Sequence, residues 1–325
     1  YVGGFFHDAV VDGDVFAVLG QWKSAKYVPA LSKMVDEILD NAIDEAIRTE
    51  FKYANKINVS VRGDTITGTY NGRGIPQAAI FDETSGDTIL RPVAAWTKVN
   101  AGTSFDDERV TIGTNGVGSA ATNFLSAQFV GRTWSNGTEV CVKCKDGADT
   151  LAITTKERIG NGTEVSFTAD FELFEVGSLE ELDTVALIED RLISLQMAFP
   201  EIAFSFNKRR VKVTDMKKYA ALFGDTCIIE KSDNLSFFFA TSEDGFRSNS
   251  FVNGVNTRSG GNYVDYLVNG VVDELGTMIK RKHKLEVVRA TIKNGLTFVK
   301  FARNFVNPKF DSQTKERLTN PYGNI

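Results

Sequence analysis

The stretch LSKMVDEILDNAIDEAIR, residues 31–48, decides the fold of this chain. Its apolar residues recur at steps of three and four, which is the period of an amphipathic helix with a broad buried face. They are Leu31, Met34, Val35, Ile38, Leu39, Ala42, Ile43, Ala46 and Ile47. We therefore expect a helix that packs against a sheet.

Three polar residues of this helix, Glu37, Asn41 and Asp44, are spaced i, i+4 and i+7 and so lie along one line. Asn41 offers a neutral oxygen to a hard cation such as Mg²⁺, and Glu37 can hold and deprotonate a water molecule. The polar flank of an ordinary surface helix carries the same residue types. The helix alone leaves both interpretations open.

Length and composition indicate a globular protein of about two domains. The chain has 325 residues, 42% hydrophobic and 24% charged, and no apolar run is long enough for a membrane helix. Its net charge is −5, so any contact with DNA must be local. The first residues do not resemble a signal peptide, and we expect the chain to be a fragment at both ends.

Cysteine and histidine are scarce. Cys141 and Cys144 form a lone CxxC within an alternating strand pattern, which would point the thiols to opposite faces. With only two histidines in the chain, we expect reduced cysteines and no zinc site. Carboxylates are then the expected acid–base groups.

The helix is followed by KINVSVRGDTITGTY, residues 56–70, whose alternation around a Gly-Asp turn predicts a hairpin. It leads into NGRGIP, residues 71–76, where two glycines let the backbone approach a flat ligand; alone, this segment is equally a plain turn. Residues 5–30 have loop character. Residues 77–110 are turn-rich, and we expect a mobile flap there.

A glycine-rich segment, GTNGVGSAATNFLSAQF, spans residues 113–129. A flexible loop that runs into a helix from Ser119 would direct free backbone amides at an anion. It is not a Walker A loop, because the terminal Gly-Lys-Ser/Thr is absent.

The remainder predicts strands in residues 129–168, a helix over 179–198 and a hairpin formed by IAFSFN and RRVKV. One apolar sheet face then needs helices to cover it. From about residue 216, strand patterns around a long helix at 262–283 predict a second, smaller α/β unit.

Four segments, EILDNAIDEA, NGRGIP, GTNGVG and NGTEV, resemble in order and spacing the nucleotide motifs of the GHKL ATPases. The chain is most similar to the ATPase portion of type IIA DNA topoisomerases, the gyrase B-like group. YVGG resembles the start of that portion, FVNGVNTRSGGNY its transducer motif and FDSQTKERL its QTK loop. KRKHK and NPKFDSQTKERL make the phage-type large subunit of the T-even group the nearest member.

This resemblance implies an α+β fold. A GHKL (Bergerat-type) two-layer α/β sandwich, the ATP-binding domain, would occupy residues 1–215. A smaller α/β transducer domain, truncated at its C-terminal end, would occupy residues 216–325.

The resemblance also implies catalytic roles. Glu37 matches the general base that activates the attacking water, and Asn41 matches the ligand of Mg²⁺. Gln313 and Lys315 match the pair that reaches from the transducer to the γ-phosphate. Together they would cover the needs of phosphoryl transfer.

Further residues match the family's nucleotide-binding positions: the acidic end of the helix motif, the adenine-pocket loop with the residue on its far side, and the lid around the phosphates. They are Asp44, Tyr70, Gly72, Gly74, Ile75, Pro76, Thr163, Gly113, Asn115, Gly116, Val117 and Gly118. Glu45 and Arg73 match a structural pair.

Two positions depart from the family pattern. The family has Asp before NGRGIP to receive the adenine amino group, and this chain has Tyr70, which puts adenine selectivity in doubt. AGTSF lacks the lysine of the family's AGGKF form, although Arg109 lies nearby in the sequence.

As a whole, the resemblance implies an ATP-hydrolysing N-gate clamp that uses ATP and Mg²⁺. It would form a homodimer on ATP closure, capture double-stranded DNA and work with the remaining topoisomerase subunit or domains in the cytoplasm, a host's if phage-encoded. It would contact no membrane and cut no DNA. The alternatives are a nucleotide-binding or dimerisation module that does not hydrolyse ATP, and a MutL-type repair ATPase.

Overall fold

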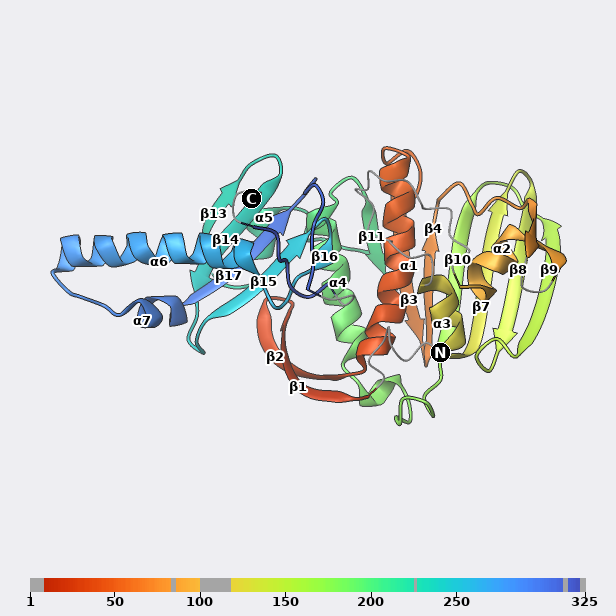
Figure 1. The fold of residues 1–325 in the computed structure, drawn as a ribbon, viewed down its shortest axis with the longest axis horizontal. Coiled ribbons are helices and arrows are strands. Elements are labelled where there is room, and N and C mark those ends of the chain that lie inside the picture. The colour runs from red at the N-terminus through yellow and green to blue at the C-terminus, as the bar shows by residue number, and fades with distance from the viewer. Residues whose placement is uncertain (1–8, 83–85, 100–117, 225–226, 312–314, 322–325) are drawn as a thin grey trace. The chain divides into compact units, whose positions relative to one another are not determined.

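The computed structural model describes residues 9–82, 86–99, 118–224, 227–311 and 315–321 (Figure 1). The chain divides into two compact units. The first contains residues 1–16, 23–196 and 201–212, and the second contains residues 17–22, 197–200 and 213–325. The sequence placed the domain boundary between residues 215 and 216.

An eight-stranded sheet forms the base of the first unit, in the order β12-β11-β3-β4-β10-β7-β8-β9. Neighbours are antiparallel except β11 and β3, which pair in parallel. The strands are β3 Lys56–Arg62, β4 Thr65–Tyr70, β7 Ser126–Ser135, β8 Thr138–Lys145, β9 Thr150–Glu157, β10 Gly162–Ala169, β11 Ala203–Phe206 and β12 Arg209–Arg210.

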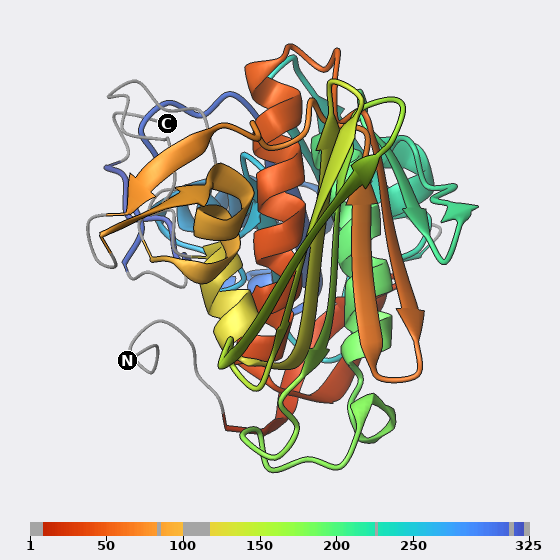
Figure 2. The same cartoon turned by 90° about the vertical axis from the view of Figure 1, so that its right-hand side faces the viewer.

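Helix α1, Pro29–Arg48, runs along one face of this sheet (Figure 2). Its apolar stripe is buried as the periodicity predicts, and each fully buried side chain of Leu or Ile size contributes roughly 1.5–3 kcal/mol. The helix approaches β4 so closely that a Cβ on Gly68 would lie 2.5 Å from Ile38 Cγ2. Three shorter helices accompany it. They are α2 Arg91–Thr97, α3 Gly118–Phe124 and α4 Thr184–Ala198.

Several local predictions are wrong. Residues 11–27 form a hairpin of β1 Val11–Val18 and β2 Gln21–Tyr27, and residues 79–97 contain the β5–β6 hairpin, Ala79–Asp82 and Asp87–Leu90, followed by α2. Both segments alternate weakly because they bury few side chains. The helix expected over 179–198 begins as a 3₁₀ turn, Leu179–Glu181, and breaks at Leu182, whose backbone is extended.

The second unit contains a five-stranded sheet of order β13-β14-β17-β15-β16. Tyr219 and Phe223 pack against Phe238 on one face, and the long helix α6 covers the other with Val264 and Val268. The bounds are α5 Met216–Ala220, β13 Cys227–Lys231, β14 Leu235–Thr241, β15 Arg247–Val252, β16 Val255–Asn256, α6 Asn262–His283, α7 Arg289–Asn294 and β17 Leu296–Ala302.

Two further expectations can be compared with the structure. Cys141, Cys144 and Cys227 are free thiols. Among the described residues, no helix combines the length and the apolar character needed to cross a membrane.

Candidate functional site

The polar line of α1 is anchored by Asn41. Its Nδ2 donates to the Glu37 carbonyl oxygen at 2.7 Å and to Ser119 Oγ of α3 at 2.9 Å. Asn41 is exposed, so its amide oxygen is accessible to an outside ligand, whereas Asp44 is only 2% exposed. Burial of Asp44 sets this line apart from the polar flank of an ordinary surface helix.

Glu37 meets the beginning of α3 directly. A Cβ added to Gly118 would lie 1.7 Å from Glu37 Oε2, so only glycine can occupy position 118 while the carboxylate stays in place. The structure therefore brings Glu37, Asn41 and Gly118 together from segments that are about 80 residues apart in the sequence.

Lys33 holds the Glu37 carboxylate from one helical turn earlier. Its Nζ lies 2.9 Å from Glu37 Oε1 and 3.7 Å from Asp40 Oδ2. Burial lowers the pKa of Lys33, but the charges of Asp40, Glu37 and Asp36 outweigh it and raise the pKa above the ordinary lysine value. Lys33 thus remains an ammonium ion at any pH at which the protein functions.

Asp40 and α4 complete this cluster. Asp40 is 6% exposed, and burial together with the neighbouring carboxylates raises its pKa. Its Oδ1 accepts no hydrogen bond from a described residue. Arg191 of α4 binds Asp36 with Nε 2.8 Å from Oδ1, and this links the second helix to the acidic part of α1.

The NGRGIP loop is fixed by α1 and β7. Arg73 forms a bidentate pair with Glu45, at 2.8 and 3.0 Å, and its backbone N–H donates to Glu45 Oε1 at 3.1 Å. Gly74 has φ of +82°, and a Cβ there would lie 2.6 Å from the Trp134 carbonyl oxygen. Ile75 N–H donates to Thr133 Oγ1 at 2.7 Å. Each end of the loop therefore has its own anchor.

Tyr70 lies at the end of β4, in register with Thr163 of β10. A Cβ added to Gly72 would lie 3.0 Å from the Tyr70 ring, so Tyr70 occupies space beside the loop. Burial raises the pKa of Tyr70 to about 12, although a hydrogen bond from the Thr163 side chain opposes the shift. The phenol is therefore neutral and can both donate and accept.

Sequence reasoning did not identify Lys33, Ser119 or Thr133. Lys33 was detectable, because it lies four residues before Glu37 on the same helix. Thr133 was not, because nothing in the strand pattern distinguishes a buried threonine that receives a loop amide from one that only packs.

The other predicted residues divide into two groups. Pro76 is exposed at the exit of the loop, and Lys315 belongs to the second unit with φ of +58°. The remaining ones lie outside the described residues. They are Gly113, Asn115, Gly116, Val117, Gln313 and the loop residue Arg109.

The donor set fits a nucleotide with a hard cation better than it fits a metal held by protein alone. No cluster of three or more His, Cys, Asp or Glu side chains with metal-binding geometry occurs among the described residues. Asn41 would supply one neutral oxygen, which suits Mg²⁺ bound mainly by phosphates and water. Gly118 lets the backbone approach Glu37 of α1, and Gly74 lets it approach the Trp134 carbonyl of β7, and such close backbone approach suits phosphate and base recognition.

Comparison with known proteins gives the same picture. A DNA gyrase B family model matches residues 209–323. The chain is 42% identical over 310 residues to the DNA topoisomerase large subunit of Enterobacteria phage T4, which covers 95% of this chain and 60% of that protein. The chain thus spans about three fifths of the length of this relative.

Solved structures agree in fold. The ATPase and transducer domains of DNA topoisomerase II from Balamuthia mandrillaris superpose with a TM-score of 0.83 at 26% identity, over 98% of this chain and 86% of that one. The ATPase region of Saccharomyces cerevisiae topoisomerase II gives 0.83 at 24% identity, over 98% and 87%. The α+β fold, with its GHKL sandwich, is confirmed.

Proposed function

Because this chain belongs to the gyrase B-like ATPase regions of type II DNA topoisomerases, we propose that it binds and hydrolyses ATP as the N-gate clamp of such an enzyme. One observation carries the proposal. The Glu37 carboxylate is ion-paired to Lys33, abuts the Gly118 backbone and lies one turn from the exposed carboxamide of Asn41.

Glu37 accepts the proton of the attacking water in this proposal. Lys33 holds the carboxylate in place through their ion pair, in which Nζ lies 2.9 Å from Oε1. Asn41 would hold Mg²⁺, which would supply positive charge to the phosphates. Lys315 adds a second cation from the transducer, with Gln313 beside it.

In this proposal the other nucleotide contacts come from the sequence motifs described above. Gly72, Gly74, Ile75 and Pro76 border the adenine, with Thr163 opposite. Asp44 lies beneath the adenine, and the Glu45–Arg73 pair holds the NGRGIP loop. Gly113, Asn115, Gly116, Val117 and Gly118 wrap the phosphates.

The proposed partners are a second copy of the chain, double-stranded DNA and the rest of the topoisomerase, in the cytoplasm. The basic run at residues 280–284, at the end of α6, would face the captured duplex. Lys280 there already pairs with Glu286 at 2.5 Å, so its share of the attraction is reduced.

Phosphate release from ATP by this chain, with and without Mg²⁺, tests the proposal. Glu37→Gln should lower turnover by roughly 10²- to 10⁴-fold and leave nucleotide binding intact, because it removes a general base and no ground-state phosphate contact. Glu50→Gln, an exposed position near the end of α1, is the matched control. Equal turnover in Glu37→Gln and the unmodified chain would exclude Glu37 as the base.

Lys315→Ala tests the transducer contact. It should lower turnover, and it should weaken binding of a non-hydrolysable triphosphate more than binding of ADP, since only the triphosphate carries a γ-phosphate. An equal loss for both nucleotides would contradict this role.

A second candidate function, a nucleotide-binding module without hydrolysis, is motivated by Tyr70 and its hydrogen bond with Thr163. If Tyr70 limits adenine binding, Tyr70→Asp should bind ATP roughly ten- to a hundredfold more tightly and discriminate better against GTP. Mg²⁺-dependent turnover separates the two functions. Unchanged affinity in Tyr70→Asp would mean that another group receives the adenine.

A further inference from the structure

The sheet of the first unit has a second face, which points away from α1. Val59, Ile66 and Val165 are buried on the α1 side, so their strand neighbours point to this outer face. The paired register lines these neighbours up in rows across the sheet.

The side chains in the middle of the outer face are short, and many of them carry hydroxyl groups. Thr65, Thr67 and Thr69 of β4 lie beside Ser166 and Thr168 of β10. Thr67 hydrogen bonds with Ser166, and the hydroxyls of Thr65 and Thr168 are 2.9 Å apart. These short side chains form a floor without a net charge.

Cations flank this floor on both sides. Lys56 and Arg62 of β3 and Arg210 of β12 lie on one side, and Lys143 and Lys145 of β8 lie on the other. All five are exposed, and none forms an ion pair with a residue that the structure describes. Four strand spacings separate β3 from β8, which places the two cationic borders about 19 Å apart.

Negative charge is nearly absent from the outer face. Among the outward positions of the described strands, the carboxylates are Glu139 and Glu164. Lys156 lies 3.3 Å from Glu139, which Arg158 also binds, and Arg132 lies 2.6 Å from Glu164. A chain of net charge −5 therefore concentrates unpaired positive charge on one side of one sheet.

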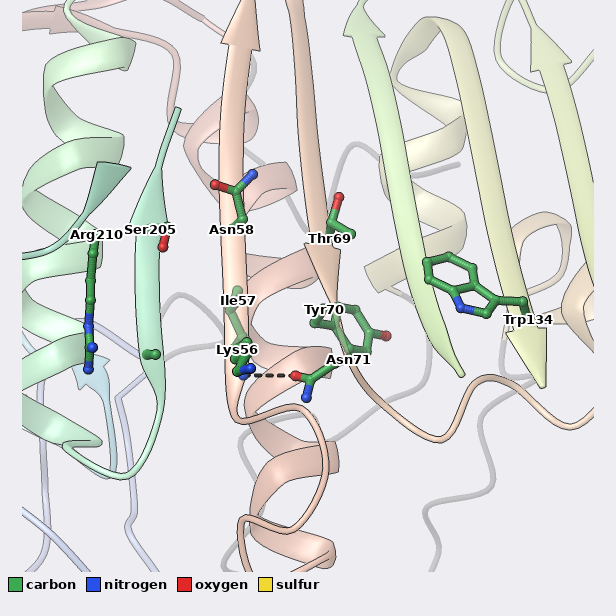
Figure 3. Close-up of a pocket in the computed structure, with 10 residues that line it drawn as sticks. Lys56, Ile57, Asn58, Thr69, Tyr70, Asn71, Trp134, Ser205 and Arg210 are labelled. Atoms are coloured by element: carbon green, nitrogen blue, oxygen red, sulfur yellow. Dashed lines mark hydrogen bonds between the residues drawn. The ribbon is translucent and has the colours of Figure 1, made fainter. Parts of the chain in front are cut away.

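A pocket opens at the β3 side of this face (Figure 3). Its volume is about 450 Å³, and Lys56, Arg210, Asn58 and Ser205 are among the residues that line it. Asn58 uses its side-chain oxygen to accept from the Lys208 backbone N–H at 3.0 Å, which leaves its Nδ2 as a donor. The lining contains no carboxylate. Two cations with amide and hydroxyl donors suit a phosphate group.

We propose that the outer face is a docking surface for double-stranded DNA, held through its phosphate backbones, with one phosphate in the pocket between Lys56 and Arg210. The cationic borders match a duplex because its two backbones run on either side of a groove, which the hydroxyl floor faces. The choice of DNA among polyanions rests on the proposed function.

A duplex fits this surface better than a single strand does. Binding of single strands uses open aromatic rings on which bases stack. Two aromatic residues line the pocket, Trp134 and Tyr70. Trp134 is 7% exposed, and the Arg158 guanidinium covers it at 3.4 Å from the ring centre. Tyr70 is half-buried and lies two residues from Gly68, on the side of the sheet that faces α1. Phosphate contacts alone remain, and they carry no sequence preference.

The test is a fluorescence anisotropy titration of this chain with a labelled duplex, without nucleotide, at a series of salt concentrations. The test variant carries Lys56→Gln, Lys143→Gln and Arg210→Gln. The control variant carries Lys217→Gln, Lys231→Gln and Lys309→Gln, which remove the same charge from exposed positions of the second unit. Thermal unfolding of both variants checks that they fold.

The test variant should bind at least tenfold more weakly at low salt, and its slope of log affinity against log salt should be smaller by about three. The control variant should bind as the unmodified chain does. Three outcomes would overturn the proposal. They are equal losses in both variants, binding by the test variant that equals that of the unmodified chain, and a preference for a single strand of the same length. Since the titration omits nucleotide, absence of ATP hydrolysis would refute the proposed function and leave this result standing.

Discussion

Burial lowers the pKa of both Lys33 of α1 and Lys300 of β17, yet the two pKa values end on opposite sides of the ordinary lysine value. Lys33 is half-buried and faces three carboxylates, which raise its pKa in spite of burial. Lys300 is 1% exposed, and burial lowers its pKa to about 7. Its Nζ lies 3.6 Å from the centre of the Tyr263 ring.

The difference shows that the charges around a lysine, more than its depth, decide whether it stays charged. The first unit keeps a permanent cation beside the proposed general base, Glu37. The second unit contains a lysine that loses its proton near neutral pH. Four substitutions test this contrast.

The largest effect is expected from Lys33→Met. Loss of the cation leaves Asp40 buried beside Glu37 without its nearest partner, so the free energy of unfolding should fall by about 3 kcal/mol. Urea unfolding measures it. Lys52→Met removes an exposed pair with Glu50 and should change little. A loss below that of the control would mean that the cluster does not depend on Lys33.

Lys300→Met should change the free energy of unfolding in the opposite direction from Lys33→Met. An unfolded lysine binds its proton up to pH 10.5, whereas folded Lys300 releases it above about pH 7, so stability rises with pH between these values. From pH 7 to 9 the unmodified chain should gain about 2 kcal/mol that Lys300→Met lacks. Unfolding at both pH values decides it, and parallel gains in the two proteins would contradict the lowered pKa.

Arg191→Met should cost about 1.5 kcal/mol, which is less than Lys33→Met. Asp36 is the carboxylate left behind, and its side chain is 32% exposed, so water can replace the lost partner. The same urea series measures this change. A cost equal to that of Lys33→Met would show that the α4 contact matters as much as the pair within α1.

The smallest effect should come from Tyr263→Leu. The ring attracts Lys300 only while the amine is protonated, so the substitution should cost about 0.5–1 kcal/mol more at pH 6 than at pH 9. Loss of packing is common to both pH values and cancels in the difference. Equal costs at the two pH values would show that the cation–π contact does not contribute to stability.

These lysines also mark the limit of sequence reasoning. The periodicity of residues 31–48 predicted α1 and its buried face, because both follow from spacing along one helix. The carboxylate partners of Lys33 lie on that helix and were readable in the same way. The burial of Lys300 was not, since its position in FVKFA depends on which strands lie on either side of it and on where α6 packs.

The residues of the candidate site likewise divide into those that local sequence motifs predict and those that only the structure identifies. Glu37, Asn41 and the NGRGIP loop were found from local motifs. Their anchors on other elements, Ser119 and Thr133, become visible only when distant strands and helices are placed in space. The hairpins at 11–27 and 79–90 were missed because their strands bury few side chains and lack the apolar alternation that marks a half-buried strand.

The parallel pairing of β11 with β3 has a consequence for synthesis of the protein on the ribosome. Ala203 pairs opposite Lys56, so one edge of β3 has no neighbour until the nascent chain has grown by well over a hundred residues. At 5–20 residues per second this takes on the order of ten seconds. During that time an unpaired strand edge is open to misplaced pairing, so the growing chain should depend on chaperones until β11 emerges.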